Sequence, residues 1–208
     1  MILYKLTDEN DQTYGKMQWG KGVTHRATGK GWNLCTNDLI HAYKHPLLAA
    51  FFNSIHAGYI NPHLWVCKVT DKCKIIDDGT KVGVKSLTTI KQMELPKITA
   101  EQRIEVAIRS TLLVYQEQPF VEWANNWLNG NNRDMPIDDI LATIGNYYYI
   151  NGIFPASAAY YAIRATADSY INPIAEKTAI SVNCVIHSSK DKVDSLGIIR
   201  SVMGLEKL

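Results

Sequence analysis

The sequence lacks several features that would assign a function directly. None of its apolar runs approaches roughly 18 residues, so we expect no membrane-spanning helix. It contains no P-loop, no GxGxxG fingerprint leading into a helix and no His-Glu-x-x-His zinc motif. The 4 cysteines form no Cys-x-x-Cys pair, which favours reduced thiols in a cytoplasmic protein, with a Cys67–Cys73 disulfide as the alternative. The net charge of +2 is too small to indicate nucleic-acid binding by itself.

The chain changes character near residue 98. Residues 1–98 carry 13 Lys and Arg against 8 Asp and Glu, a balance of +5, whereas residues 99–208 carry 9 against 12, a balance of −3. The first part is short-patterned, interrupted by glycine, and holds most of the histidines and cysteines. We therefore predict two regions, a β-rich unit over 1–98 and a helical unit over 99–208, which could also form one continuous domain, and expect ligand chemistry in the first.

Helix signals support this division. Pro46 suits the first turn of a helix over residues 45–57, which would be inserted into the β-rich unit. Thr99 followed by Gln102 predicts a capping box at the start of the next helix, and Pro119 predicts that this helix kinks or restarts. The pattern indicates an α+β protein in which a small, mainly antiparallel β unit with an inserted helix packs on a C-terminal helical bundle.

Histidines and one cysteine are the first candidates for chemistry. His41 and His45 are four residues apart, but Pro46 disfavours helical backbone angles at His45, so we predict no metal site. Cys35 and His41 could act as a nucleophile and its base, although a small buried apolar role is the default interpretation of Cys35.

A glycine-rich, basic and aromatic run over residues 15–31 and its flank is the second candidate. Such residues can contact a phosphate backbone and stack on bases, and they can equally form hairpin turns with solvated lysines. Adjacent tyrosines near residue 148 cannot all face one core, so some are expected to contribute to a partner surface. The predicted binding residues are Lys16, Trp19, Lys21, Arg26, Lys30, Trp32, Tyr148 and Tyr149.

The segment Thr89–Glu94 is predicted to be a strand on which Gln92 and Glu94 face the same side. This Gln-x-Glu spacing resembles the catalytic strand motif of ADP-ribosyltransferases. The resemblance implies NAD as the cofactor, Glu94 as the residue that stabilises an oxocarbenium-like ribose, and His25 as a ribose contact. It therefore predicts that His25, Gln92 and Glu94 converge in one cleft. A solvent-facing strand edge is the other interpretation of this segment.

A second resemblance covers roughly residues 1–130. It is carried by Trp19–His25, Leu34–Cys35, His41–Tyr43, Pro46–Ala49, Asn61–Trp65, Gly79–Gly83 and Ser86–Thr89. In these segments the chain is similar to uncharacterised proteins encoded by bacteriophages and prophages, in which a small β-rich part precedes alanine-rich helices. This resemblance implies a viral accessory protein that acts in the bacterial host cytoplasm, and it implies no reaction.

Three functions follow from the sequence. The first is a phage accessory protein that binds a host or defence-system macromolecule in an anti-defence or host-takeover role, without a cofactor; it predicts a broad exposed patch and no deep polar cleft. The second is an ADP-ribosyltransferase-like or other nucleotide-handling enzyme. The third is a nucleic-acid-binding module that uses the basic residues of the first unit, with Lys85 on the same face as Lys16 and Lys21. The sequence leaves open whether the protein is an enzyme, and it leaves the oligomeric state open.

Overall fold

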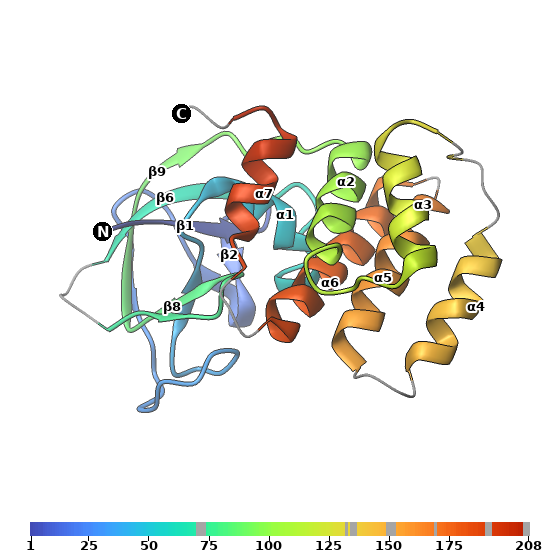
Figure 1. Ribbon diagram of the computed structural model, residues 1–208. Coiled ribbons are helices and arrows are strands. Elements are labelled where there is room, and N and C mark those ends of the chain that lie inside the picture. Colours follow the sequence, from blue (N-terminus) through green and yellow to red (C-terminus); the bar gives the residue numbers. More distant parts are fainter. Residues whose placement is uncertain are drawn as a thin grey trace. The chain divides into compact units, whose positions relative to one another are not determined.

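The structure is a computed structural model of the 208-residue chain. It describes residues 1–69, 74–131, 133, 137–148, 153–168, 170–189 and 193–205, without the side chains of 139, 143, 145–148 and 153. The chain has the α+β class that the sequence predicts, and it divides into two compact units, Met1–Lys97 and Ile98–Leu208. Figure 1 shows the helices and strands of both units. No helix within the described ranges is long and apolar enough to cross a membrane.

The first unit is built on an antiparallel sheet with the strand order β1-β6-β9-β4. β1 (Ile2–Thr7) pairs with β6 (His63–Val69), which pairs in turn with β9 (Ser86–Met93). The short β4 (Thr24–Arg26) pairs with the start of β9, and a β-bulge at Val66 and Cys67 shifts the register of β6 against β9. β1, β6 and β9 run side by side in Figure 1.

A second sheet has the order β5-β8-β7, formed by β5 (Ile40–Ala42), β8 (Val82–Val84) and β7 (Ile76–Asp77). A bridge between Tyr4 and Tyr43 joins the edge of β1 to β5. The hairpin of β2 (Gln12–Thr13) and β3 (Met17–Gln18) encloses the 3-10 turn η1 (Tyr14–Lys16). Side chains of both sheets form one core, which comprises Leu3, Trp19, Ile40, Ala42, Trp65, Cys67, Val82, Val84 and Leu87.

The inserted helix α1 spans Pro46–His56 and packs against β1. Its start follows the sequence, because His45 has extended backbone angles before Pro46 and its side chain accepts a hydrogen bond from the Leu47 amide. The helix buries an apolar face that includes Leu47, Phe51 and Phe52, which fixes the position of the helix end beside the two sheets.

The second unit is helical. α2 (Ala100–Thr111) begins at Thr99 with the predicted capping box, and α3 (Gln118–Leu128) carries Pro119 in its first turn, where the missing amide costs nothing. The remaining helices are α4 (Ile137–Tyr148), α5 (Ile153–Thr166), α6 (Ile171–Ser188) and α7 (Ser195–Val202). Trp123 and Trp127 are buried in its core, as expected of apolar residues on a helix stripe.

Alanines of α5 set the closest packing in this unit. α5 packs against both α2 and α6, and Ala156, Ala158, Ala159, Ala162 and Ala165 are fully buried at these contacts. Small side chains let helix backbones approach closely, so the Ser181 hydroxyl of α6 can donate to the Ala158 carbonyl of α5 at 2.9 Å. The alanine-rich segment therefore has a packing role.

Candidate functional site

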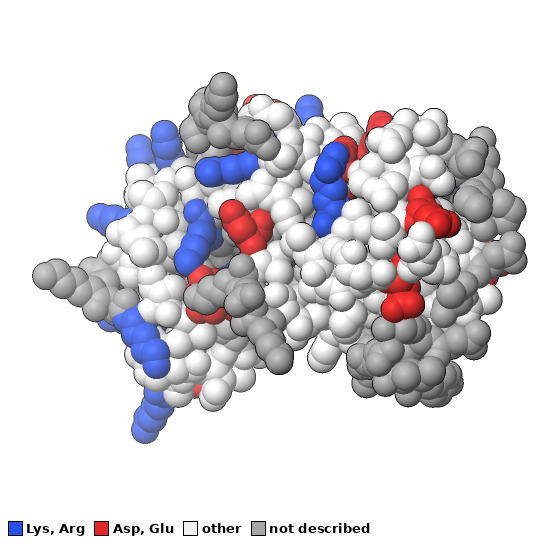
Figure 2. All heavy atoms as spheres, viewed as in Figure 1, with Lys and Arg blue, Asp and Glu red and all other residues white. Residues whose placement is uncertain are grey.

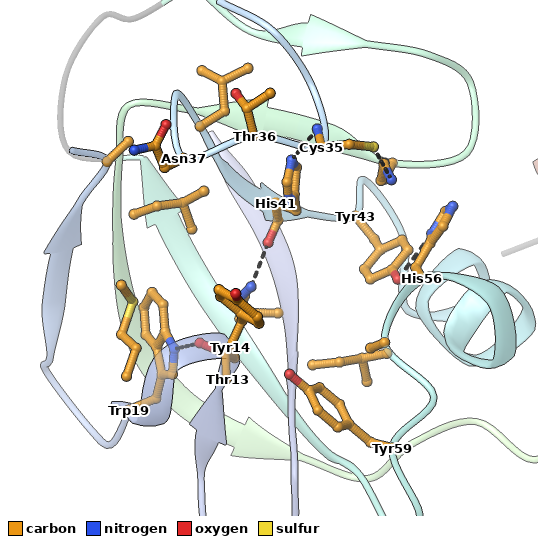
Figure 3. A pocket seen from close by; sticks show the side chains of 18 of the residues that line it. Thr13, Tyr14, Trp19, Cys35, Thr36, Asn37, His41, Tyr43, His56 and Tyr59 are labelled. Atoms are coloured by element: carbon orange, nitrogen blue, oxygen red, sulfur yellow. Dashed lines mark hydrogen bonds between the residues drawn. The ribbon is translucent and has the colours of Figure 1, made fainter. Parts of the chain in front are cut away.

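The first unit contains a cleft with a volume of about 750 Å³ (Figure 3). Its walls come from β1, the β2–β3 hairpin, the segment from Arg26 to His41 and the end of α1. Among the residues that line it are Lys5, Asp8, Tyr14, Trp19, Arg26, Cys35, His41, Tyr43, His56, Tyr59 and Lys81.

Lys5 places a cation at the inner end of this cleft. Alternation along β1 puts its side chain on the same face as the buried Leu3. The ammonium donates a hydrogen bond to the His41 carbonyl at 2.9 Å and lies 5.6 Å from the centre of the Trp19 ring. Burial disfavours the charged form and lowers the pKa of Lys5 to about 8. Lys5 is therefore a cation at neutral pH that loses its charge near pH 8.

His41 stands between two ammonium groups. Its Nε2 accepts a hydrogen bond from the Cys35 amide at 3.0 Å, so Nδ1 carries the proton of the neutral ring. Burial, followed by the charges of Lys5 and Lys81, lowers the pKa of His41 to about 4. The imidazole is consequently neutral at physiological pH and offers one N–H donor.

Cys35 and Lys81 complete this row of groups. The Lys81 ammonium donates to the Cys35 sulfur at 3.1 Å, and Cys35 has a left-handed backbone conformation with φ of 64°. Cys35 is exposed, so the expectation of a buried apolar cysteine is wrong. The contacts Lys5–His41, His41–Cys35 and Cys35–Lys81 form one continuous chain, which we call the cation row.

Hydrogen bonds from Lys85 and to Asp38 hold the loop that carries Cys35 in place. The Lys85 ammonium donates to the carbonyls of Gly29, Gly31 and Asp38, and it lies 4.9 Å from the centre of the Trp32 ring. The Asp38 carboxylate accepts hydrogen bonds from the Gly31 and Asn33 amides. A β-carbon at Gly29 or Gly31 would overlap this carboxylate, which explains why both positions need glycine.

A second part of the cleft wall, beside Lys81, is a chain of hydrogen bonds that ends at the Tyr43 hydroxyl. The Thr80 hydroxyl donates to Asp78 at 2.8 Å, which leaves its oxygen to accept from His56 Nε2 at 3.4 Å. His56 Nδ1 is then free to accept from the Tyr43 hydroxyl at 3.3 Å, as drawn in Figure 3. Burial, together with the charge of Lys81, lowers the pKa of His56 to about 4. This wall is therefore polar and uncharged next to the cleft.

The charge of the lining is positive. Among the described residues that line the cleft, Lys5, Arg26 and Lys81 are the cations and Asp8 is the carboxylate. Asp8 is turned to its own backbone, because its carboxylate accepts from the Asn10 and Gln12 amides. Among the residues that the structure describes, no carboxylate forms an ion pair with Lys5 or Lys81. The Asp78 carboxylate interacts electrostatically with Lys81, but it accepts hydrogen bonds from the Thr80 and Lys81 amides and forms no ion pair with the ammonium groups of the cation row.

The structure does not bring together the three residues of the transferase hypothesis. His25 pairs with Leu87, and Gln92 lies five residues further along β9, a distance of roughly 16 Å at the usual rise of a strand. Gln92 and Glu94 are exposed. His25 packs edge-on against Trp19 and bonds to the Gln18 carbonyl. None of these residues lines the cleft.

The predicted basic and aromatic residues also separate into groups. Arg26 and Trp19 line the cleft, although Trp19 is only 2% exposed and donates from Nε1 to Thr13. Trp19 is therefore a core residue and not an exposed stacking platform. Trp32 is 37% exposed, and the ammonium groups of Lys74 and Lys85 lie over its ring.

Lysines of the predicted set are exposed on turns and strand ends, namely Lys16, Lys21 and Lys30. Lys85 is withdrawn into the carbonyl cage of the loop, so it cannot share an exposed basic face with them. In Figure 2, Lys and Arg side chains lie over the left and central part of the view, where uncharged surface and a few acidic side chains separate them. The side chain of Tyr148 and all of Tyr149 lie outside the described residues.

Comparisons with known proteins give no functional assignment for this chain. The chain matches no protein-family model, no curated protein and no solved structure.

Proposed function

We propose that the first unit binds a small phosphate-bearing anion in the cleft, with the phosphate at the cation row. The observation that carries this proposal is the pair of ammonium groups, Lys5 and Lys81, which flank a neutral His41 and form no salt bridge with a described carboxylate. A cation removed from water is costly unless an opposite charge accompanies it. An anionic ligand would supply that charge.

The chemistry of the row fits a phosphate group. Lysine binds phosphate as a point charge, and the Nδ1–H of neutral His41 would add a directed donor without a further charge to desolvate. The volume of about 750 Å³ falls in the range of small-molecule sites. A cleft of this kind suits a protein that binds nucleotides, although His25, Gln92 and Glu94, which the sequence assigned to that class, do not line it.

The other sequence-based interpretations stay predictions. These are the phage origin, the host or defence partner, the cytoplasmic location and the nucleic-acid-binding role. The macromolecule-binding interpretation expected no deep polar cleft, and the cleft with its lysines lends that interpretation no support. The transferase chemistry lacks the convergence of His25, Gln92 and Glu94 that it needs.

The direct test is calorimetric titration of the protein with inorganic pyrophosphate at neutral pH and low salt. The matched variants are Lys81→Gln in the cleft and Lys91→Gln, which removes an exposed lysine from β9. Loss of one charge-assisted contact weakens binding by about 1.5–3 kcal/mol, so we expect Lys81→Gln to raise Kd by roughly 10- to 100-fold. Lys91→Gln should change Kd by less than about twofold.

A wild-type protein that binds pyrophosphate no more tightly than about 10 mM would contradict the proposal. Equal effects of Lys81→Gln and Lys91→Gln would do the same, because they would indicate a diffuse attraction instead of a site. Thermal unfolding of each variant checks that the fold of the first unit is retained.

A further inference from the structure

Tyr14 is a large aromatic side chain held almost wholly in solvent at the cleft. It is 98% exposed and belongs to the residues that line the cleft. It begins η1, the turn between β2 and β3, in which Gly15 and Lys16 have left-handed φ angles of 72° and 56°. Such a turn fixes where its side chains point.

The hairpin that carries Tyr14 is anchored on both sides of the turn. The Trp19 indole donates to the Thr13 hydroxyl at 2.9 Å, and the Gln12 and Gln18 side chains bond across the pair at 3.0 Å. Trp19 itself is buried in the core. The exposed ring is thus attached to a fixed support, and figure 3 shows it near the centre of the cleft view.

A second tyrosine lines the cleft near the end of α1. Tyr59 is held by the Asn53 side chain, which accepts from its amide at 3.3 Å and donates to its carbonyl at 2.9 Å. In Figure 3 the Tyr59 ring extends toward the same part of the cleft as Tyr14. Tyr14 and Tyr59 therefore offer aromatic surface in the cleft that also contains the cation row.

We propose that the ligand is a free nucleotide whose base stacks on Tyr14 while its phosphates contact Lys5 and Lys81. This inference rests on the proposed function, which it deepens by naming the substrate class. Every nucleobase has a flat π-face, so stacking on an exposed aromatic ring is sequence-tolerant and strengthens binding substantially. A phosphate-only ligand would occupy the cation row and leave Tyr14 in water.

The test compares ADP with pyrophosphate on the full chain, because pyrophosphate keeps the two phosphates and removes the nucleoside. We expect ADP to bind about tenfold more tightly than pyrophosphate. Tyr14→Ala should weaken ADP by about tenfold and leave pyrophosphate unchanged, whereas Tyr14→Phe should retain ADP binding. Tyr170→Ala, at a 76% exposed tyrosine of the second unit, is the matched control. Because the Tyr14 side chain is exposed, its variants should retain the fold, which thermal unfolding checks.

The outcomes separate the two proposals. Pyrophosphate binding with ADP no tighter, or ADP binding that Tyr14→Ala leaves unchanged, overturns the nucleotide inference and leaves the anion site standing. Absence of binding for both ligands overturns the proposed function and the inference with it. A short oligothymidine that binds about tenfold more tightly than ADP would assign the ring contact to a nucleic-acid strand and overturn the assignment to a free nucleotide.

Discussion

The two units treat polar groups in opposite ways. The first unit places lysines in the lining of a cleft, where they form hydrogen bonds, whereas the core of the second unit is rich in alanines, isoleucines and tryptophans. Within the first unit the lysines differ as well. Lys85 donates to three carbonyls, whereas among the described residues Lys5 donates to one carbonyl and Lys81 to one sulfur. The difference distinguishes a lysine that stabilises the loop from the two lysines to which we assign the bound anion.

The same contrast applies to the second unit's role. The buried hydroxyls of Thr111 and Ser181 bond to each other at 3.1 Å, and they lie among helices packed by small side chains. A core of this type favours a fixed scaffold over a ligand site. The comparison therefore predicts that reactivity and ligand response belong to the first unit, and each of the following experiments can break or sharpen that division.

The largest expected effect is the difference in alkylation rate between the exposed and the buried cysteines. Cys35 is exposed in the cleft, whereas burial raises the pKa of Cys67 to about 12 and raises the pKa of Cys184 above its usual value. Iodoacetamide reacts with the thiolate, so Cys35 should be alkylated on the order of a hundredfold faster than either buried thiol. Peptide mass spectrometry of a time course, on protein carrying Cys73→Ser, measures the three rates separately.

Ligand occupancy sharpens this measurement. Pyrophosphate at the cation row should slow alkylation of Cys35, since Lys81 contacts both the sulfur and the expected phosphate position. The rate at Cys184 is the internal control and should not change. Equal labelling of Cys35 and Cys184 in the native protein would contradict the division between an open cleft and a closed helical core.

Acid should destabilise the first unit before the second. Burial, followed by neighbouring positive charge, lowers the pKa of both His41 and His56 from 6.5 to about 4. Because the unfolded chain then binds more protons than the folded chain, stability is complete above pH 6.5 and is lost as the pH falls toward 4. After allowance for solvent screening we expect a loss of about 3 kcal/mol from the first unit.

Unfolding by urea at several pH values, followed by amide hydrogen exchange, measures this loss unit by unit. The double variant His41→Gln/His56→Gln should abolish most of the decline between these pH values. The second unit has the exposed His187 in its described part and should change little over the same range. A parallel decline in both units would show that the histidines of the cleft are not its cause.

Alkaline pH should weaken anion binding more modestly. The pKa of Lys5 is lowered to about 8 by burial, and a bound anion stabilises its charged form. Affinity is therefore complete below pH 8 and falls as the pH rises through that value, by about tenfold over the next pH unit. Pyrophosphate titrations across this range measure the effect. Lys5→Arg should flatten the profile, because arginine keeps its charge; a profile that is flat in the wild type would mean that Lys5 does not contact the anion.

Much of the fold could be predicted from local signals. The boundary near residue 98, the helix that follows Pro46 and the restart at Pro119 each depend on neighbours within a few residues, and such signals are readable in one sequence. The pairing order β1-β6-β9-β4 could not be predicted, because its β1–β6 and β4–β9 pairs join segments about 60 residues apart. Register is set by burial on both faces, which only the folded unit defines.

The site shows the same limit more sharply. Cys35 and His41 were paired in the sequence analysis, but the partner that makes the pair notable, Lys81, is 46 residues from Cys35. Lys5 lies in an apolar strand where a single charge facing inward would have been a signal, since strand alternation places it with Leu3. The Gln-x-Glu spacing instead pointed to the end of β9, where Gln92 and Glu94 are exposed and do not line the cleft.

The smallest effect tests whether the two units are energetically separate. Thr99 accepts from the Gln102 amide at 3.2 Å, and Gln102 returns the contact to the Thr99 amide at 2.9 Å. Thr99→Ala removes one side of this capping box and should cost the second unit about 1 kcal/mol of unfolding free energy. Thr99→Ser should restore the lost unfolding free energy.

Urea unfolding followed by hydrogen exchange measures the loss in the second unit, and pyrophosphate titration of the same variant measures ligand binding by the first unit. An unchanged Kd is expected, because the cleft is lined by residues of the first unit alone. A cap variant that weakened pyrophosphate binding would instead show that the scaffold and the cleft fold as one cooperative body.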